Sequence, residues 1–204
     1  MKPYRIAVLA SGSGSNFQAI VDAVAAGKLD VRVELLVCDR PQAPVVERAR
    51  RAGVPVFAFR PKEYPSREVY ETEIVRQLQE RGVDLVVMAG YMRLITDTLL
   101  APYVGRIVNV HPSLLPAFPG MDAVGQALAY GAKVAGITVH FVDGGMDTGP
   151  IIAQRAVEIQ EDDTAETLAL RLHRIEHELY PEVIGWLRAG RAVLEENGRR
   201  VRIH

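Results

Sequence analysis

Cysteine and net charge are both scarce in this sequence of 204 residues, which has one cysteine and a formal net charge of −1. The single Cys38 excludes an intramolecular disulfide framework. Because it lies in an apolar run, it is predicted to be a small buried hydrophobe and not a catalytic thiol. The near balance of charges leaves no overall field that would draw the chain to nucleic acid or to an anionic membrane.

Long apolar runs are also missing, since none approaches the roughly 18 residues that a membrane span requires. The first apolar stretch, Ile6–Ala10, is too short for the core of a signal peptide and is better explained as a strand. We therefore expect a soluble, cytoplasmic protein. Hydrophobic residues make up 49% of the chain, which is enough for a genuine core.

The first half of the chain alternates strand-like runs with helical patterns. This rhythm predicts βαβ units and an α/β fold with an open, mostly parallel, twisted sheet flanked by helices. The glycines that follow three of the helices favour left-handed ends. The expected strands are Arg5–Ala10, Val31–Cys38, Val56–Phe59, Leu85–Ala89 and Arg106–Val110, the helices Asn16–Ala26, Val45–Ala52, Arg67–Arg81 and Asp97–Leu100, and the glycines Gly27, Gly53 and Gly82.

After Pro112 the pattern changes to a Pro- and Gly-marked loop, and antiparallel strands are expected in this half. A long helix should begin at a capping box formed by Asp163 and Glu166, and Pro181 should kink or break it near Tyr180. We predict one domain, 1–204, with halves 1–110 and 111–204. The expected elements are a helix at Val124–Tyr130, strands Val134–Val142 and Ile151–Ile159, and a hairpin with strands Ala192–Glu195 and Arg200–Ile203 around Asn197-Gly198.

A glycine-rich loop, Ser11–Asn16, lies between the first strand and the first helix. Glycines let the backbone approach a ligand, and a helix start offers unpaired N–H groups, so the loop could hold a phosphate. A third glycine and a lysine are both missing, which excludes the dinucleotide fingerprint and the P-loop. A tight turn with a Ser or Asn cap remains an equal alternative.

Asn109 and His111 lie at the end of an expected strand, where side-chain alternation points both to the same side. An amide beside an imidazole can stabilise an oxyanion and deliver a proton. The plainer alternative is a histidine that caps the strand. The loop Asp143–Pro150 adds an aspartate that could keep an imidazole charged, or it is an ordinary acidic turn in which Asp143 is the turn residue.

The remaining histidines favour structural interpretations. His173 and His177 have a spacing that can bind zinc, but there are no partner cysteines and no H-E-x-x-H pattern, so we predict no metal site and a polar helix face. His140 in an apolar strand and His204 at the terminus are expected to be structural or incidental.

Four segments in this order resemble the folate-dependent glycinamide ribonucleotide transformylases along almost the whole chain. They are Ser11–Phe17, Gly90–Leu94, Asn109 with His111–Gly120, and Gly136–Val142 running into Asp147–Gln154. The resemblance implies transfer of a formyl group from 10-formyltetrahydrofolate to the amine of glycinamide ribonucleotide in purine synthesis. It implies small-molecule substrates, no metal, and a monomer or homodimer.

The resemblance also implies residue roles, with phosphate binding in the first half and folate binding and the catalytic loop in the second. A tetrahedral intermediate would be stabilised by Asn109 and protonated His111, with Asp147 in support. The backbone of Asp143–Asp147 would meet the pteridine. The implied substrate residues are Gly14, Ser15, Asn16, Gly90, Pro112 and Glu176, and the implied folate residues are Arg67, Met92, Arg93, Leu94, Ile95, Asn109, Asp143 and Asp147.

Departures from the family pattern occur at His173, where the family has glutamine, and at Asp122 and Val124, where some members have histidines. Rival functions are formyl transfer to methionyl-tRNA, formyltetrahydrofolate hydrolysis and a nucleotide-sensing module without catalysis. The first two usually need a further domain for which this chain has no room. The third does not explain why Asn109, His111 and Asp147 occur together.

Overall fold

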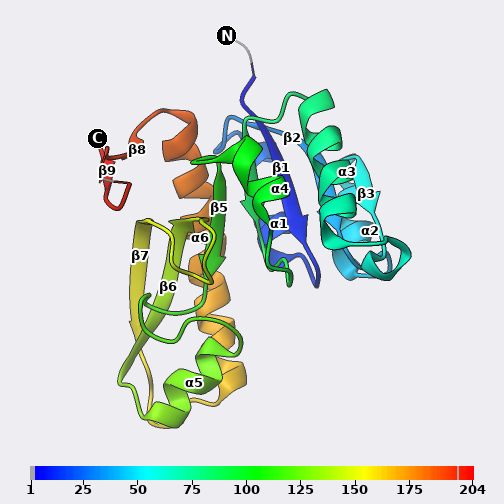
Figure 1. Cartoon of the computed structure of the whole chain (residues 1–204). Helices are drawn as coiled ribbons and strands as arrows, with labels where there is room; N and C mark the ends of the chain where they lie inside the picture. Colours follow the sequence, from blue (N-terminus) through cyan, green and yellow to red (C-terminus); the bar gives the residue numbers. More distant parts are fainter. Residues whose placement is uncertain (1–2, 197) are drawn as a thin grey trace. The chain divides into compact units, whose positions relative to one another are not determined.

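The chain divides into two units, Met1–Val108 and Asn109–His204, in a computed structural model that describes residues 3–196 and 198–204. Parallel strands build the first unit in the order β3-β2-β1-β4, with β1 in the middle (Figure 1). Every residue from Ile6 to Ala10 is fully buried, as expected for a strand with helices on both faces. The strands are β1 (Arg5–Ala10), β2 (Arg32–Cys38), β3 (Val56–Ala58) and β4 (Leu85–Met88).

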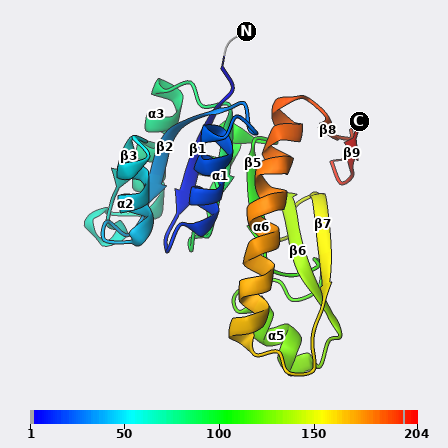
Figure 2. The ribbon, with the colours of Figure 1, turned by 180° about the vertical axis from the view of Figure 1, so that it is seen from behind.

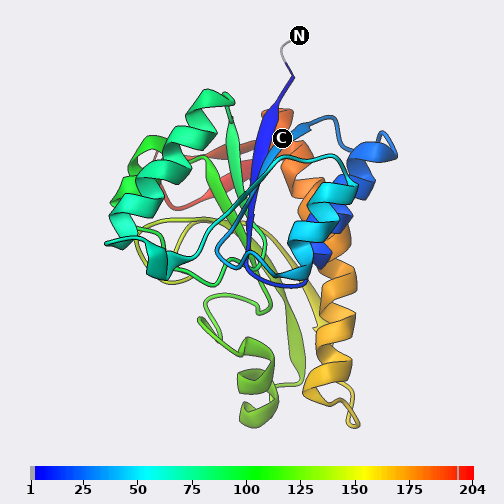
Figure 3. The same cartoon turned by 90° about the vertical axis from the view of Figure 1, so that its right-hand side faces the viewer.

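Helices cover both faces of these strands. Figures 2 and 3 show α1 and α2 on one face and α3 on the other. The predicted elements of this half are confirmed to within one residue at each end, and Gly27, Gly53 and Gly82 have φ of +69°, +68° and +61°. The helices are α1 (Ser15–Ala25), α2 (Pro44–Arg51), η1 (Pro61–Glu63), α3 (Arg67–Glu80), α4 (Asp97–Leu100) and η2 (Ala101–Tyr103).

Strand β5 (Ile107–His111) begins in the first unit and ends in the second. In the second unit β6 and β7 are antiparallel, as predicted, and α6 packs along both (Figure 2). Strands β8 and β9 pair as the predicted hairpin, whose Asn197 lies outside the described residues. The elements are α5 (Ala123–Tyr130), β6 (Val134–Phe141), β7 (Ile151–Glu158), α6 (Ala165–Arg188), β8 (Ala192–Leu194) and β9 (Val201–Ile203).

Helix α6 corrects two predictions. Its capping box joins Thr164 and Thr167, one residue beyond the predicted Asp163–Glu166 pair, because Thr164 takes the extended conformation of an N-cap. A break at Pro181 is wrong, since the helix continues to Arg188. Tyr180, Pro181, Val183 and Ile184 are all buried, and this packing outweighs the roughly 3 kcal/mol that an internal proline costs.

Cys38 is buried at the end of β2, as predicted, and burial raises the pKa of its thiol. The predicted fold class is confirmed by the parallel strands of the first unit and the antiparallel strands of the second. Among residues 3–196 and 198–204, no helix combines the length and the apolar character needed to cross a bilayer.

Candidate active site

The end of β5 presents the two residues that alternation placed together. Val110 between them is 8% exposed, and His111 is buried, while Asn109 is half-buried. Asn109 contacts His140, and both His140 and His111 contact Asp147, so the polar pair lies on one side of the strand, as a period of two requires. Both side chains make polar contacts within the second unit.

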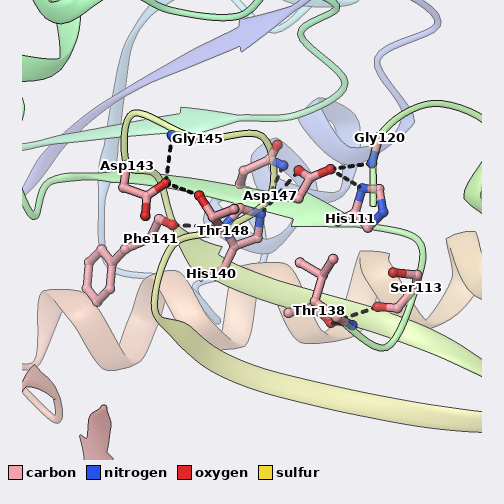
Figure 4. A network of polar contacts seen from close by, with 12 residues as sticks. His111, Ser113, Gly120, Thr138, His140, Phe141, Asp143, Gly145, Asp147 and Thr148 are labelled. Carbon is pink, nitrogen blue, oxygen red and sulfur yellow. Dashed lines mark hydrogen bonds and ion pairs between the residues drawn. The ribbon is translucent and has the colours of Figure 1, made fainter. Parts of the chain in front are cut away.

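Both ring nitrogens of His111 face acceptors. Nε2 lies 2.9 Å from the carbonyl oxygen of Phe118, and Nδ1 lies 3.4 Å from Oδ2 of Asp147 (Figure 4). A ring that carries a proton on each nitrogen satisfies both contacts, whereas a neutral ring leaves one lone pair against an oxygen. The two contacts thus hold the ring in one orientation, between Phe118 and Asp147.

Asp147 is held by the backbone as well as by His111. Its Oδ2 accepts a hydrogen bond from the Gly120 N–H at 2.8 Å, and its side chain is 13% exposed. Its φ is +54°, and φ of Phe118 is +51°. Non-glycine residues in this region typically cost about 1–2 kcal/mol, and such strain gathers at functional sites. Both strained residues contact the His111 ring.

The loop that carries Asp147 is shaped by its own first residue. Oδ1 of Asp143 accepts hydrogen bonds from the Gly145 N–H at 3.0 Å and the Thr148 hydroxyl at 2.6 Å (Figure 4). A Cβ on Gly149 would come within 1.8 Å of the Phe141 carbonyl oxygen, so only glycine fits where the loop closes. The side chain of Asp143 therefore stabilises the turn, which agrees with the interpretation of this loop as an acidic turn.

The loop after β5 is fixed from the neighbouring strands. The fully buried hydroxyl of Thr138 on β6 donates to the Ser113 carbonyl at 2.7 Å and accepts from the Leu115 N–H at 3.0 Å (Figure 4). Gln154 on β7 donates to the Leu115 carbonyl at 2.9 Å. These contacts hold the chain that leads from His111 to Phe118 and Gly120.

His140 is the residue that sequence reasoning missed. Its Nδ1 lies 2.8 Å from the Phe141 carbonyl, its Nε2 3.3 Å from the Asn109 amide nitrogen and 3.7 Å from Oδ1 of Asp147. Of the two expectations, structural or incidental, the contacts support a structural role, and they add that His140 touches two of the three predicted catalytic residues. Alternation with Thr138 on one buried strand was the signal: polar residues two apart share a face.

The pKa of His140 is lowered, chiefly by burial, against the raising effects of the Phe141 carbonyl and Asp147. The neutral ring must keep its proton on Nδ1 to donate to Phe141, which leaves Nε2 as an acceptor. Nε2 then accepts from the Asn109 amide and fixes which way that amide points.

We expect this lowered pKa to appear in the pH dependence of stability. Below about pH 6.5 the unfolded chain takes up a proton at His140 while the folded chain resists it, so stability is lost as the pH falls toward the folded pKa. Urea unfolding of wild type and His140→Gln at pH 7.5 and 5.5 should show wild type losing more. The control is His204→Gln, at the exposed terminus, which should lose as much stability between the two pH values as wild type does. If wild type and His140→Gln lose the same amount of stability between pH 7.5 and 5.5, the interpretation is refuted.

In the first unit the glycine-rich loop leads into α1 as predicted. Gly14 is the N-cap with φ +74° and, as a glycine, offers no side chain to cap the first turn. A Cβ on Gly14 would lie 2.4 Å from Cγ2 of Val45 on α2. Glycine is thus required at this position by its positive φ and by the side chain of Val45.

The predicted folate segment follows β4. Gly90 has φ +73° and accepts a hydrogen bond from the Ser11 N–H at 3.0 Å. Met92 and Leu94 are 59% and 53% exposed, so this short segment presents two large apolar side chains to solvent. Arg67 donates to the Leu94 carbonyl at 3.2 Å, so the structure brings Arg67 to the segment that includes Arg93 and Ile95.

The other predicted residues belong to the second unit. Pro112 directly follows β5, and Glu176 is a buried carboxyl on α6, 4% exposed. On the same helix, the rings of His173 and His177 stack with centroids 6.4 Å apart. In the part of the chain that the structure describes, no three side chains form a metal-binding group.

Comparisons with known proteins agree on one family. The family model described as formyl transferase matches residues 4–184. A phosphoribosylglycinamide formyltransferase of Bacillus subtilis is 59% identical over 180 residues, 88% of this chain and 92% of that protein. One of Escherichia coli is 38% identical over 192 residues, 94% of this chain and 91% of that protein.

A solved structure shows the same fold. The glycinamide ribonucleotide transformylase 1 of Symbiobacterium toebii superposes with a TM-score of 0.95 at 52% identity and covers 98% of this chain and 94% of its own. High identity over nearly the full length of each relative extends the match beyond the fold. The chain therefore belongs to the formyl transferase family, among its phosphoribosylglycinamide formyltransferases.

Proposed function

We propose that this enzyme transfers the formyl group of 10-formyltetrahydrofolate to the amine of glycinamide ribonucleotide through a tetrahedral intermediate. The observation that carries the proposal is the position of His111. Its ring lies between the Phe118 carbonyl and Asp147, and it is on the same strand, β5, as Asn109. This arrangement suits a developing oxyanion, because it holds a positive charge and an amide donor in place in advance.

The chain's own residues divide the work in the following way. Attack by the substrate amine on the formyl carbon places negative charge on the formyl oxygen, which the imidazolium of His111 and the amide of Asn109 stabilise. When the intermediate collapses, the bond between the formyl carbon and N10 of the folate breaks, and N10 takes up the proton that the amine loses. One N–H of Asn109 is directed to His140, which leaves the other for the oxyanion. Asp147 keeps His111 charged and oriented. Removal of one group that stabilises an oxyanion typically lowers turnover by a factor of about 10²–10³.

Substrate phosphate binding is proposed at the start of α1, through Gly14, Ser15 and Asn16. The first N–H groups of a helix lack partners within the helix, and the macrodipole adds roughly half a positive charge there. The N-cap residue of α1 is Gly14, which has no side chain to cap this turn. Gly90, Pro112 and Glu176 are proposed to contact the rest of the glycinamide ribonucleotide.

The formyl donor is proposed to lie against Arg67 and the segment 92–95, with Asn109 and the Asp143–Asp147 loop meeting its pteridine. The exposed Met92 and Leu94 offer apolar surface that suits a flat aromatic ring. The folate supplies the activated formyl group. Four further points remain predictions. They are a cytoplasmic location, small molecules as the partners, a monomer or homodimer as the assembly, and the assignment of the whole chain to one domain.

The experiment that tests this function compares acceptors. Purified protein is mixed with 10-formyltetrahydrofolate, and consumption of the donor is followed by absorbance with and without glycinamide ribonucleotide. We expect fast consumption that depends on glycinamide ribonucleotide and saturates with it. Consumption at the same rate without an acceptor would instead indicate hydrolysis, and no consumption in either case would exclude folate-dependent formyl transfer.

A further inference from the structure

The segment from Tyr91 to Thr96 alternates between buried and exposed side chains. Tyr91 is 7% exposed, whereas Met92 and Leu94 between the inward residues are more than half exposed. The Arg93 side chain is 36% exposed and bonded to a buried carboxylate. One face of this extended segment therefore presents apolar side chains to solvent, and the other is directed into the first unit.

Three acceptors from three different elements hold the inward face. Ser11, after β1, accepts the Met92 N–H at its Oγ at 2.9 Å. Asp39, after β2, accepts Nε of Arg93 at 2.8 Å. Glu71 on α3 accepts the Thr96 N–H at 3.1 Å and also the Thr96 hydroxyl.

Two of these acceptors are buried carboxyl groups, which fold stability alone does not explain. Asp39 is 3% exposed and Glu71 is 1% exposed. A buried carboxylate costs free energy unless it is well paired, and a buried ion pair is often no better than an apolar substitute. Asp39 is paired only in part: its Oδ1 and the Tyr91 hydroxyl are buried without a hydrogen-bond partner among the described residues. Burial, and then the charge of Asp39, raise the pKa of Tyr91.

Helix capping does not account for Glu71 either. Thr96 already caps α4 by accepting the Thr98 N–H, and α4 spans four residues, Asp97–Leu100. The carboxylate of Glu71 instead binds the end of the exposed segment to α3, whose first residue, Arg67, binds the Leu94 carbonyl. Glu71 and Arg67 thus fix two neighbouring positions of one segment from one rigid helix.

We propose that Asp39 and Glu71 are positioning residues for the formyl donor. They hold Arg93 and Thr96 so that Met92 and Leu94 face the folate with a fixed backbone between them. This inference rests on the proposed function, because it assigns a donor-binding role to segment 92–95. A preorganised segment costs no ordering entropy on binding, so the effect should appear in donor affinity and not in turnover.

The test compares Glu71→Ala with the conservative Glu71→Gln, whose amide can still accept the Thr96 N–H. Titration with the unformylated analogue 5,8-dideazafolate measures donor-site affinity without catalysis. We expect Glu71→Ala to raise both its Kd and the KM for 10-formyltetrahydrofolate at least about tenfold, since bonds to a charged acceptor are lost. KM for glycinamide ribonucleotide and kcat should change less than about threefold, and Glu71→Gln should recover most of the affinity.

Asp84→Asn is the matched control. Asp84 accepts the Arg5 N–H at 2.9 Å in the same unit, just before β4 and away from segment 92–95. The affinity of the Asp84→Asn variant for 5,8-dideazafolate should equal that of wild type. If Glu71→Ala does not fold, two other variants replace it. Asp39→Asn weakens the contact with Arg93, and Thr96→Ala removes the hydroxyl that donates to Glu71. Each should raise the Kd several-fold.

The outcomes separate the two proposals. Wild type that transfers formyl to glycinamide ribonucleotide, together with an unchanged Kd in a folded Glu71→Ala or in both substitute variants, overturns the positioning role alone. Equal rises in the KM values of both substrates overturn it as well, because they indicate a general disturbance. Wild type that consumes no donor with glycinamide ribonucleotide refutes the proposed function itself.

Discussion

Replacement of His111 by alanine is expected to lower kcat at least about a hundredfold, the typical cost of removing an oxyanion donor. The ring contacts Asp147 and the Phe118 carbonyl, and alanine loses both contacts together with the proposed imidazolium. Steady-state kinetics with each substrate varied in turn should show the loss in kcat more than in either KM.

The control for His111→Ala is His204→Ala, at the exposed end of the chain. It should retain wild-type kinetics. Circular dichroism and thermal unfolding should show that His111→Ala remains folded, since its neighbours are held by Thr138, Gln154 and Gly120 independently of the ring. A folded His111→Ala enzyme with a rate near wild type would remove His111 from the mechanism.

Asp147→Asn is expected to lower kcat by a similar factor, about 10² or more, because it removes a charge while keeping the shape of the side chain. The asparagine oxygen can still accept the Gly120 N–H, so the loop should keep its conformation. What is lost is the negative charge 3.4 Å from Nδ1 of His111, which supports the imidazolium.

The pH–rate profile distinguishes this electrostatic role from simple disturbance. An asparagine carries no charge at any pH, so the low rate of Asp147→Asn should persist across the whole pH range over which wild type is active. An unchanged rate and an unchanged profile in Asp147→Asn would show that Asp147 has no such role.

The elements of the fold were predictable because local patterns and packing agree over most of the chain. The apolar run of β1 and the glycines after three helices are signals that packing does not reverse. Pro181 and the start of α6 were not predictable in the same way, because the burial of Tyr180, Val183 and Ile184 decides them and is not a local property.

The candidate site was predictable where one strand carries it and less so where distant segments meet. Alternation brings Asn109 and His111 to one side of β5 from sequence alone. His140 was missed because an apolar strand favours a structural role, and its contacts with Asn109 and Asp147 are 31 and 7 residues away. The part played by Val45 at Gly14 was not predictable for the same reason, because the side chain that excludes a Cβ there lies on another helix.

The most direct test of the central claim follows the formyl carbon itself. The enzyme is given 10-formyltetrahydrofolate labelled with ¹³C in the formyl group, glycinamide ribonucleotide and water as the competing acceptor, and the products are read by NMR. We predict that the label appears as a formamide on the glycinamide nitrogen, with little free formate. Label that collects in formate while glycinamide ribonucleotide remains unmodified would contradict the account.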